Sequence, residues 1–408
     1  MTNKSKVPQI RFKGFIGEWK ESELGNKVEF FSGLTYSPNN VVKDNGTLVL
    51  RSSNVKDGRI VDADNVYVNS DVINCNNVQK DDIAVVVRNG SRSLIGKHAQ
   101  IQKGMNNTVI GAFMTGIRSE QPSFINALLD SPKFYKEIEK NLGATINQIT
   151  TGAFKKMTFS FSEEFEQTKI GDYFQQLDKL IEQKEKKYQK LKQFKKAMLD
   201  KMFPKNGADT PEIRFKSFSE KWEEKKLGDL IEFIVDNRGK NPRYYCNEGI
   251  PVIDNFMIKN NYHPKLREAT RFIDENLFNN FIRKYIEPYD TVITLVGNGI
   301  GNITLVPKEK SVIIQNTLGL RFSNDKIFMF YCLLSKNREI KHLDRGMAQP
   351  SIRQDELLDI EIKTPKDLEE QEKIGNYFQK LDNQIDLQQK ELKKLKNIKK
   401  ASLSKMFA

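Results

Sequence analysis

The chain has 408 residues, which is enough for two or three domains that each bury a core. Its net charge of +13, from 66 Lys and Arg against 53 Asp and Glu, favours a polyanionic partner such as nucleic acid, although a lysine-rich proteome produces the same balance. The sequence has no apolar run long enough to cross a membrane, an opening segment without a signal-peptide core, and three scattered cysteines, which together predict a cytoplasmic protein without disulfides.

The first predicted feature is an internal repeat. Residues 8–30 and 211–233 are identical at 12 of 23 positions, and they begin PQIRFKGF and PEIRFKSF. A second matched pair, KIGDYFQQLDKLI and KIGNYFQKLDNQI, opens a later segment of each copy. Residues 31–160 and 234–362, which lie between the matched segments, are largely unrelated to each other. This order predicts two domain-sized copies, which share the matched segments at their two ends and differ in the regions between them.

The first copy begins with a β-rich region at residues 20–160. Short runs such as TLVL, DIAVVV and MTFSF have the composition of strands, and turn signals such as DNG and KDG separate them. The segment SFINALLDSPKFYKEIEKNL predicts a helix. We therefore expect a mixed domain of strands and short helices.

Residues 164–203 predict one long helix. Apolar residues recur three and four apart along it, which is the pattern of a heptad seam, and Pro204 ends it. At 1.5 Å per residue the helix is about 60 Å long, and a helix of this length with one apolar stripe needs a partner. Its distal half is rich in lysine, which fits a solvated face or, alternatively, a contact with a partner subunit or a DNA backbone.

The second copy follows the same plan over residues 224–364 and then predicts a second long helix. Polar gaps in its seam at Gln388 and Lys399 match those at Lys184 and Lys195 in the first helix. The matched register favours a coiled coil between the two helices over two helices that each pack on their own domain. The predicted seam consists of Ile170, Phe174, Leu177, Ile181, Tyr188, Leu191, Ile374, Phe378, Leu381, Ile385, Leu392 and Leu395.

The loops of both variable regions are rich in Asn, Gln, Arg and Ser. Arg pairs with guanine, Asn and Gln pair with adenine, and Lys and Arg also position phosphates. Ordinary turn chemistry explains any one of these residues, but the whole set in two basic domains favours DNA contact. The candidate DNA-binding residues are Arg51, Asn54, Lys56, Arg88, Asn89, Ser91, Arg92, Asn106, Asn107, Asn147, Gln148, Asn237, Arg238, Lys240, Asn255, Lys259, Asn298, Asn302, Gln315, Asn316, Arg345, Gln349 and Arg353.

Three motifs resemble chemical sites but lack essential parts. NPRYY at Asn241 has Arg243 in place of the second proline of an amino-methyltransferase loop. GNGIG at Gly297 is not followed by a helix or a Lys-Ser/Thr pair, so it is a poor phosphate cradle. DIEIK at Asp359 resembles the carboxylate-lysine part of a nuclease site, but the matching segment of the first copy has no acidic residue. The three histidines form no catalytic triad and no metal-binding pattern. We therefore interpret the chain as non-catalytic and without a metal site.

Over essentially its whole length the chain resembles the specificity subunit of a type I restriction–modification system. The resemblance rests on KIGDYFQQLDKLI…KKAMLDKMF and KIGNYFQKLDNQI…KKASLSKMF, on the two openings, and on the lead-ins GATINQI and GMAQPSI, of which only the second has a proline, Pro350. It implies two mixed α/β target-recognition domains joined by two antiparallel coiled-coil helices, as a pseudo-two-fold repeat in the α+β class. The implied boundaries are 1–162 for the N-terminal recognition domain, 163–206 for the first helix, 207–365 for the C-terminal recognition domain and 366–408 for the second helix.

The resemblance also implies a function. Each recognition domain is expected to read one half of a bipartite, asymmetric site on double-stranded DNA, and the helices are expected to set the spacer and dock two modification subunits. Those subunits bind S-adenosylmethionine, and restriction subunits add chemistry that uses ATP and Mg²⁺, so this chain itself needs no cofactor. The alternatives are a stand-alone DNA methyltransferase or nuclease and a non-catalytic coiled-coil scaffold. An enzyme would need a catalytic domain, which this length and these motifs do not supply. A scaffold would not need polar loops as varied as these.

Overall fold

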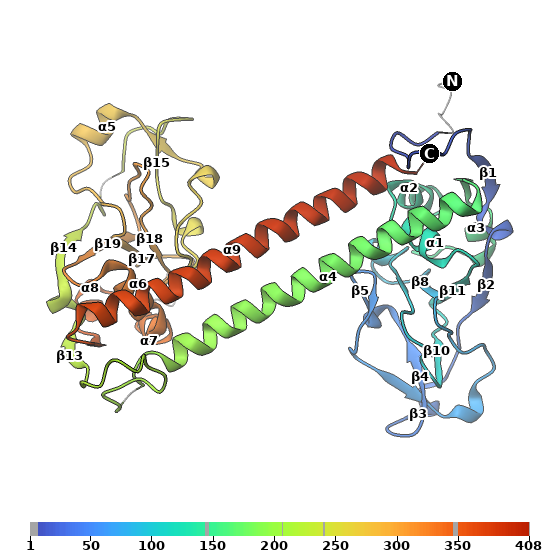
Figure 1. The fold of residues 1–408 in the computed structure, drawn as a ribbon, viewed down its shortest axis with the longest axis horizontal. Helices are drawn as coiled ribbons and strands as arrows, with labels where there is room; N and C mark the ends of the chain where they lie inside the picture. The colour runs from blue at the N-terminus through green and yellow to red at the C-terminus, as the bar shows by residue number, and fades with distance from the viewer. Residues whose placement is uncertain (1–6, 143–146, 206, 240, 346–349, 408) are drawn as a thin grey trace. The chain divides into compact units, whose positions relative to one another are not determined.

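The structure is a computed structural model that describes residues 7–142, 147–205, 207–239, 241–345 and 350–407 (Figure 1). The chain forms two compact units. Unit 1 contains Met1–Glu185 and Glu391–Ala408, and unit 2 contains Lys186–Lys390. Each unit therefore combines one sequence copy with the final part of the long helix that belongs to the other copy.

Unit 1 is built on two four-stranded sheets with the orders β2-β11-β8-β9 and β10-β4-β7-β3. The run DIAVVV forms β8, whose side chains are buried on both faces: Ile83 and Val85 lie in one apolar cluster, and Ala84 and Val86 in another. Burial of both faces explains why this strand is apolar throughout instead of alternating. The strands are β1 (Lys20–Glu23), β2 (Glu29–Ser32), β3 (Val41–Val42), β4 (Thr47–Leu50), β5 (Val55–Lys56), β6 (Arg59–Ile60), β7 (Val66–Val68), β8 (Ile83–Val86), β9 (His98–Gln100), β10 (Thr108–Ile110), β11 (Met114–Arg118) and β12 (Thr158–Phe161).

The segment expected to be helical in unit 1 forms two short helices, α1 (Pro122–Leu129) and α2 (Pro132–Asn141). The Ser131 hydroxyl accepts a hydrogen bond from the Phe134 backbone N–H at 3.4 Å and so caps α2. Pro132 disfavours a helical conformation at the residue before it, which separates the two helices. The remaining helices of this copy are α3 (Thr151–Lys155) and the long α4 (Glu164–Lys201).

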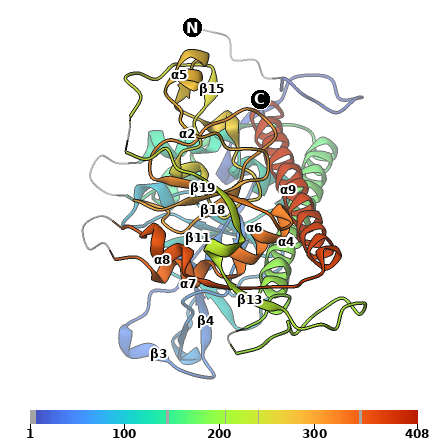
Figure 2. The same cartoon turned by 90° about the vertical axis from the view of Figure 1, so that its left-hand side faces the viewer.

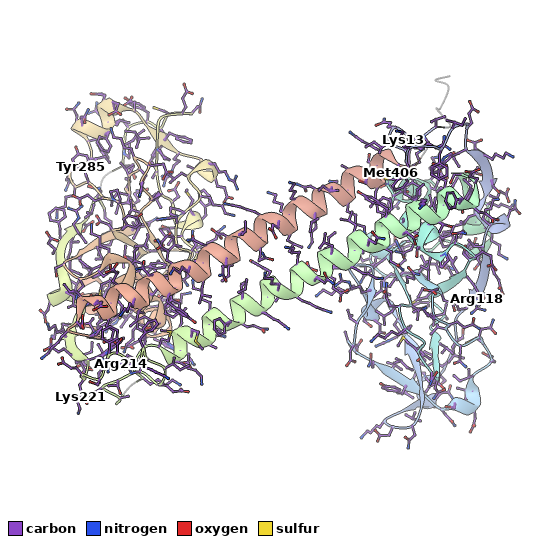
Figure 3. The ribbon with its side chains drawn as sticks, viewed as in Figure 1. Lys13, Arg118, Arg214, Lys221, Tyr285 and Met406 are labelled. Atoms are coloured by element: carbon purple, nitrogen blue, oxygen red, sulfur yellow. The ribbon has the colours of Figure 1, made fainter. Side chains whose placement is uncertain are left out.

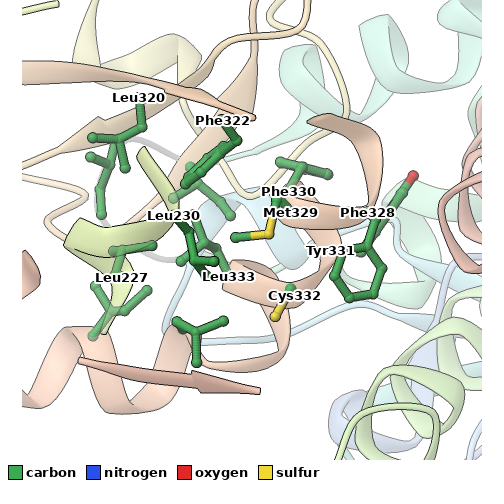
Figure 4. Close-up of a cluster of buried hydrophobic side chains, with 14 of the residues drawn as sticks. Leu227, Leu230, Leu320, Phe322, Phe328, Met329, Phe330, Tyr331, Cys332 and Leu333 are labelled. Carbon is green, nitrogen blue, oxygen red and sulfur yellow. The ribbon is translucent and has the colours of Figure 1, made fainter. Parts of the chain in front are cut away.

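Unit 2 has a four-stranded sheet with the order β14-β19-β17-β18, and the helix α6 packs against β18 and β19 (Figure 2). The buried side chains between this helix and the sheet include Leu320, Phe322 and Met329 (Figure 4). The strands are β13 (Glu223–Lys226), β14 (Ile231–Val235), β15 (Ile250–Pro251), β16 (Phe272–Ile273), β17 (Thr291–Thr294), β18 (Ile303–Leu305), β19 (Thr317–Phe322) and β20 (Glu361–Thr364). The helices are α5 (Glu275–Asn280), α6 (Lys326–Ser335), α7 (Asn337–His342), α8 (Gln354–Leu358) and α9 (Leu368–Lys405).

The end of each long helix enters the core of the other copy. In unit 1, Leu403 of α9 and the two residues Met406 and Phe407 that follow this helix belong to the main apolar cluster. Figure 3 labels Met406 at this end of the helix. The Phe407 ring lies 5.6 Å from Phe124 and 6.1 Å from Phe174, measured between ring centroids. We define this cluster of rings as the terminal socket of unit 1.

Unit 2 contains the same socket, with the end of α4 as its occupant. The Phe203 ring lies 5.8 Å from Phe328 and 5.9 Å from Phe378, and Trp222 completes the set at 6.1 Å. Each ring has its repeat-matched partner in unit 1, where Trp19 lies 6.3 Å from Phe407. The repeated sequence KMF therefore places one phenylalanine in each socket.

The long helices pair antiparallel within each unit. In unit 1, Tyr173 and Ser402 are joined by a 3.1 Å hydrogen bond between their hydroxyls, and Lys184 Nζ lies 2.5 Å from Glu391 Oε2. Residue numbers rise along one helix as they fall along the other, which makes the pairing antiparallel. In unit 2, Lys195 Nζ lies 2.6 Å from Asp382 Oδ1, so the lysines at two polar gaps of the predicted seam, Lys184 and Lys195, form ion pairs between the helices.

The predicted seam has two parts with different burial. Leu177, Ile181 and Leu392 form a small buried cluster with Leu395 at its edge, as a coiled coil requires. The residues nearer the start of each helix, Ile170, Phe174, Ile374, Phe378 and Leu381, also pack into the core of their own domain. The helices therefore pair with each other as a coiled coil at Leu177, Ile181 and Leu392, and nearer its start each helix also packs on its own domain. Tyr188, Leu191 and Ile385 are half-buried.

A buried ion-pair cluster fixes the end of α9 in unit 1. Lys399 Nζ lies 2.7 Å from both Asp130 and Asp178, and His98 Nε2 lies 3.3 Å from Asp130. Burial acts to raise the pKa of Asp130, but the neighbouring His98 and Lys399 outweigh it and hold that pKa well below its usual range. Lys399 occupies the position in the second copy that Lys195 occupies in the first. Each of these lysines therefore forms an ion pair with an aspartate of the other long helix, Lys195 with Asp382 and Lys399 with Asp178.

Candidate nucleic-acid interface

In unit 1 a short segment of chain lies between Phe113, which directly precedes β11, and residues 147–149. Directly after β8, the backbone N–H groups of Val87 and Arg88 donate to the Phe113 carbonyl at 3.0 and 3.1 Å. On the other side, the Asn89 N–H donates to the Asn147 carbonyl at 3.2 Å, and the Ile149 N–H donates to the Val87 carbonyl at 2.9 Å. We call this arrangement of backbone hydrogen bonds the loop frame. It fixes the direction in which the side chain at position 88 leaves the sheet.

Unit 2 repeats the loop frame with different residues. The N–H groups of Leu295 and Val296 donate to the Asn316 carbonyl at 2.7 and 3.3 Å, and the Gly297 N–H donates to the Pro350 carbonyl at 2.9 Å. Asn316 has a φ of 62°, a left-handed conformation that asparagine tolerates better than most residues. Asn147 thus takes the place of Pro350, and the missing proline of the first lead-in leaves this hydrogen bond intact. Residues 143–146 and 346–349 of the lead-ins lie outside the described residues.

The side chains on the two frames have different chemistry. In unit 1 the guanidinium carbon of Arg88 lies 4.9 Å from the centroid of the Phe113 ring, and this ring is 55% exposed. The matching positions in unit 2 are Val296 and Asn316. One frame therefore presents an arginine stacked on an aromatic ring, and the other presents an aliphatic side chain beside an amide.

Unit 2 has a pocket of about 340 Å³ beside its loop frame. Asn298, Gln315 and Asn316 line it with amide groups, and Phe256, which is 45% exposed, adds an aromatic ring. Amides donate and accept hydrogen bonds, and an aromatic ring stacks on a base, so this lining has the groups that recognise a base edge. Sequence reasoning found the amides but missed Phe113 and Phe256, whose exposure at the ends of apolar runs is not visible in the sequence.

Two predicted contact residues are wrong as direct readers because their side chains are buried. Asn54 is fully buried, and its amide donates to the Ala63 carbonyl at 2.7 Å and to Asn65. Asn237 is 6% exposed; its amide group donates to the Lys284 carbonyl at 2.8 Å. These groups satisfy buried backbone atoms and leave nothing for a base, so both residues support loops.

Several other predicted amides stabilise the loops that carry them. Asn89 donates to the Ser52 hydroxyl at 3.0 Å, and Asn255 donates to the Val296 carbonyl at 2.9 Å. Their remaining hydrogen-bonding groups still reach the surface in part, since both side chains are half-buried. The same bracing is provided by Asn107 to the Gly46 carbonyl, Asn147 to the Gly90 carbonyl and Asn302 to the Ile258 carbonyl.

The predicted arginines divide into paired and unpaired groups. Carboxylates lie within 2.7 Å of Arg51, Arg238, Arg345 and Arg353, which bind Asp64, Asp236, Glu356 and Asp355 respectively. Arg353 donates a hydrogen bond to Asp355, which raises the pKa of Arg353, and Arg238 donates one to Asp236, which lowers the pKa of Asp236. Within the described part of the chain, the guanidinium groups of Arg88 and Arg92 have no hydrogen bond or carboxylate partner.

The other predicted contact residues lie mainly at the surface. Gln148 is half-buried and pairs with Arg88 in a backbone bridge. Lys240 and Gln349 lie outside the described residues. The exposed residues are Lys56, Ser91, Asn106, Lys259 and Asn298.

Two kinds of structure are absent from the described residues. None of their helices is long and apolar enough to cross a membrane. No group of three or more His, Cys, Asp or Glu side chains among them is arranged to hold a metal ion.

The sequence and the fold are similar to known proteins. A family model described as "Type I restriction modification DNA specificity domain" matches residues 16–193 and 219–397. The MjaVIII type I restriction enzyme specificity subunit of Methanocaldococcus jannaschii is 26% identical over 63% of this chain and 63% of its own length. The StySPI specificity subunit of Salmonella potsdam is 25% identical over 60% of this chain and 53% of its own length. The matches thus span less than two thirds of these relatives.

Solved structures agree with the fold over nearly the whole chain. The S subunit of the type I restriction–modification system of M. genitalium has a TM-score of 0.68 and 17% identity, covering 98% of this chain and 99% of that one. A chain from a study of complex assembly and conformational transition of the type I R-M system has a TM-score of 0.53 and 16% identity, covering 94% of this chain and 96% of that one. At these identities the likeness concerns the fold alone, and it confirms two mixed α/β domains with two long helices.

Proposed function

Because this chain belongs to the family of type I restriction modification DNA specificity domains, we propose that it is the DNA-recognition subunit of a restriction–modification complex. Each unit reads one half of a bipartite, asymmetric site on double-stranded DNA. The chain itself is non-catalytic, and it supplies sequence recognition to subunits that modify or cut DNA.

One observation carries this proposal: the two units repeat the same loop frame and place different side chains on it. Arg88 and Phe113 occupy the positions that Val296 and Asn316 occupy in unit 2. Base edges are distinguished by the donors and acceptors that face them, so a constant backbone with changed side chains is suited to reading two different sequences. A structural scaffold has no need for this difference.

The long helices fit the second part of the proposal. Both are 38 residues long, and each is followed by a phenylalanine that occupies an aromatic socket. The two sockets, one in each unit, are built from matching residues of the repeat. In the proposed complex they set the unread spacer between the half-sites and dock two modification subunits, to which restriction subunits are added. S-adenosylmethionine, ATP and Mg²⁺ then belong to those partner subunits.

The test compares the purified chain with and without modification subunits. Both preparations are incubated with genomic DNA and S-adenosylmethionine, and methylated positions are mapped by sequencing. We expect no methylation by the chain alone and methylation at one bipartite, asymmetric site by the complex. Methylation or cleavage by the chain alone would support an enzyme instead, and a complex without sequence preference would support a scaffold.

A further inference from the structure

The stacked arginine of unit 1, Arg88, differs from four of the other candidate arginines because it has no described carboxylate partner, and from the fifth, Arg92, because only Arg88 has a described contact with an aromatic ring. Arg51, Arg238, Arg345 and Arg353 are each neutralised by a nearby carboxylate. Arg88 is exposed, and its guanidinium has no carboxylate or hydrogen-bond partner within the described part of the chain. Its donors are therefore available to a ligand.

Two backbone contacts and one side-chain contact fix the position of Arg88. Its backbone N–H donates to the Phe113 carbonyl at 3.1 Å, and its backbone forms a bridge with Gln148 on the opposite side. The guanidinium carbon lies 4.9 Å from the Phe113 ring centroid. A guanidinium that stacks on a ring through its face keeps the N–H groups of its edge free. A long, flexible side chain is thereby held in one direction before it meets its ligand.

The exposure of Phe113 also indicates that this ring supports the Arg88 side chain at the surface. A phenylalanine that is 55% exposed contributes little to the core, yet it carries the only described cation–π contact of Arg88. An exposed, planar donor group on a fixed support matches the two acceptors, O6 and N7, that guanine presents in the major groove. Contacts to phosphates need no such fixed direction, because they position the protein and carry no sequence information.

We propose that Arg88 reads a guanine in the half-site recognised by unit 1, and that Phe113 positions its guanidinium. This proposal rests on the proposed function and adds the base and the residue that reads it. Unit 2 has no donor at the matching position, Val296, so it reads its half-site through other groups. The amide-lined pocket of Asn298, Gln315 and Asn316 is the corresponding surface there.

The second unit supplies the matched variant. Arg88→Val places at this position the residue that the loop frame of unit 2 already accommodates, so the backbone is expected to fold. Arg92→Ala is the control, because Arg92 is an exposed, unpaired arginine four residues away in the same loop. Phe113→Leu keeps an apolar side chain and removes the ring.

The full chain in complex with modification subunits is incubated with duplexes of randomised sequence, and the bound duplexes are sequenced. Arg88→Val should reduce the preference for guanine at one position of one half-site by about 5- to 150-fold, which is the range for a bidentate base contact. Phe113→Leu should reduce the same preference to a smaller extent. Arg92→Ala should weaken binding equally for all sequences, and all variants should retain the other half-site.

Two results would overturn the inference and leave the proposed function intact. One is an unchanged guanine preference in Arg88→Val, and the other is a loss of preference at both half-sites. If the unaltered chain in its complex selects no sequence, the proposed function itself fails. Thermal unfolding of each variant, compared with the unaltered chain, shows that a lost preference does not come from a lost fold.

Discussion

Removing the second copy should convert the first copy into a symmetric dimer. A fragment of residues 1–206 lacks the end of α9, which places Leu403, Met406 and Phe407 in the core of unit 1. Burial of each of these side chains contributes about 1.5–3 kcal/mol, so the fragment loses about 5–9 kcal/mol as an upper value. The end of α4 carries the matched residues Leu199, Met202 and Phe203, so a second copy of the fragment can fill the empty terminal socket.

The expected result is a homodimer at micromolar concentration, measured as twice the fragment mass by light scattering. With modification subunits, such a dimer should direct methylation to an interrupted palindrome of the first half-site, because both of its recognition domains are the same. The control is Phe203→Ala in the fragment, which removes the ring that fills the socket and should shift the mass toward the monomer. A folded fragment that stays monomeric, or a Phe203→Ala fragment that dimerises as well as its parent, would refute the exchange of helix ends.

Two further predictions follow from the helices. Asp130→Asn should lower the free energy of unfolding by about 2–3 kcal/mol at neutral pH, because it removes a carboxylate that Lys399 and His98 bind. Since the fold lowers the pKa of Asp130, its contribution is complete above the ordinary value of 3.8 and is lost as the pH falls through the lowered pKa; urea titrations across the acid range should show the two proteins converging. Inserting four residues after Lys186 adds about 6 Å of helix, which corresponds to roughly two base pairs, so methylation mapping should find a longer spacer between unchanged half-sites. An unchanged spacer in an active insertion variant would count against the helix as the element that sets this distance.

Elements with strong periodicity could be predicted from the sequence. The runs TLVL and MTFSF form β4 and β12, and α4 begins at Glu164, where the long helix is expected to begin. The strands β1 and β13 were not predicted because their sequences, KESE and EEKK, are polar throughout. Their antiparallel partners, β12 and β20, supply the apolar side chains, so the pairing is visible only in three dimensions.

The candidate interface could be predicted only in part. The sequence identifies loops rich in Asn and Arg, but it does not distinguish an exposed amide such as Asn298 from a fully buried one such as Asn54. That distinction depends on which backbone groups each loop leaves without a partner after folding. The pairing of Arg51 with Asp64 likewise depends on a turn that brings together residues 13 positions apart.

In the proposed function, each unit reads its own half-site through a constant frame. The most direct test replaces residues 31–160 with the corresponding segment of a relative and maps the DNA methylation that the resulting complex produces. We expect one half-site to change completely, while the other half-site and the spacer stay the same. A change in both half-sites, or in neither, would contradict this expectation.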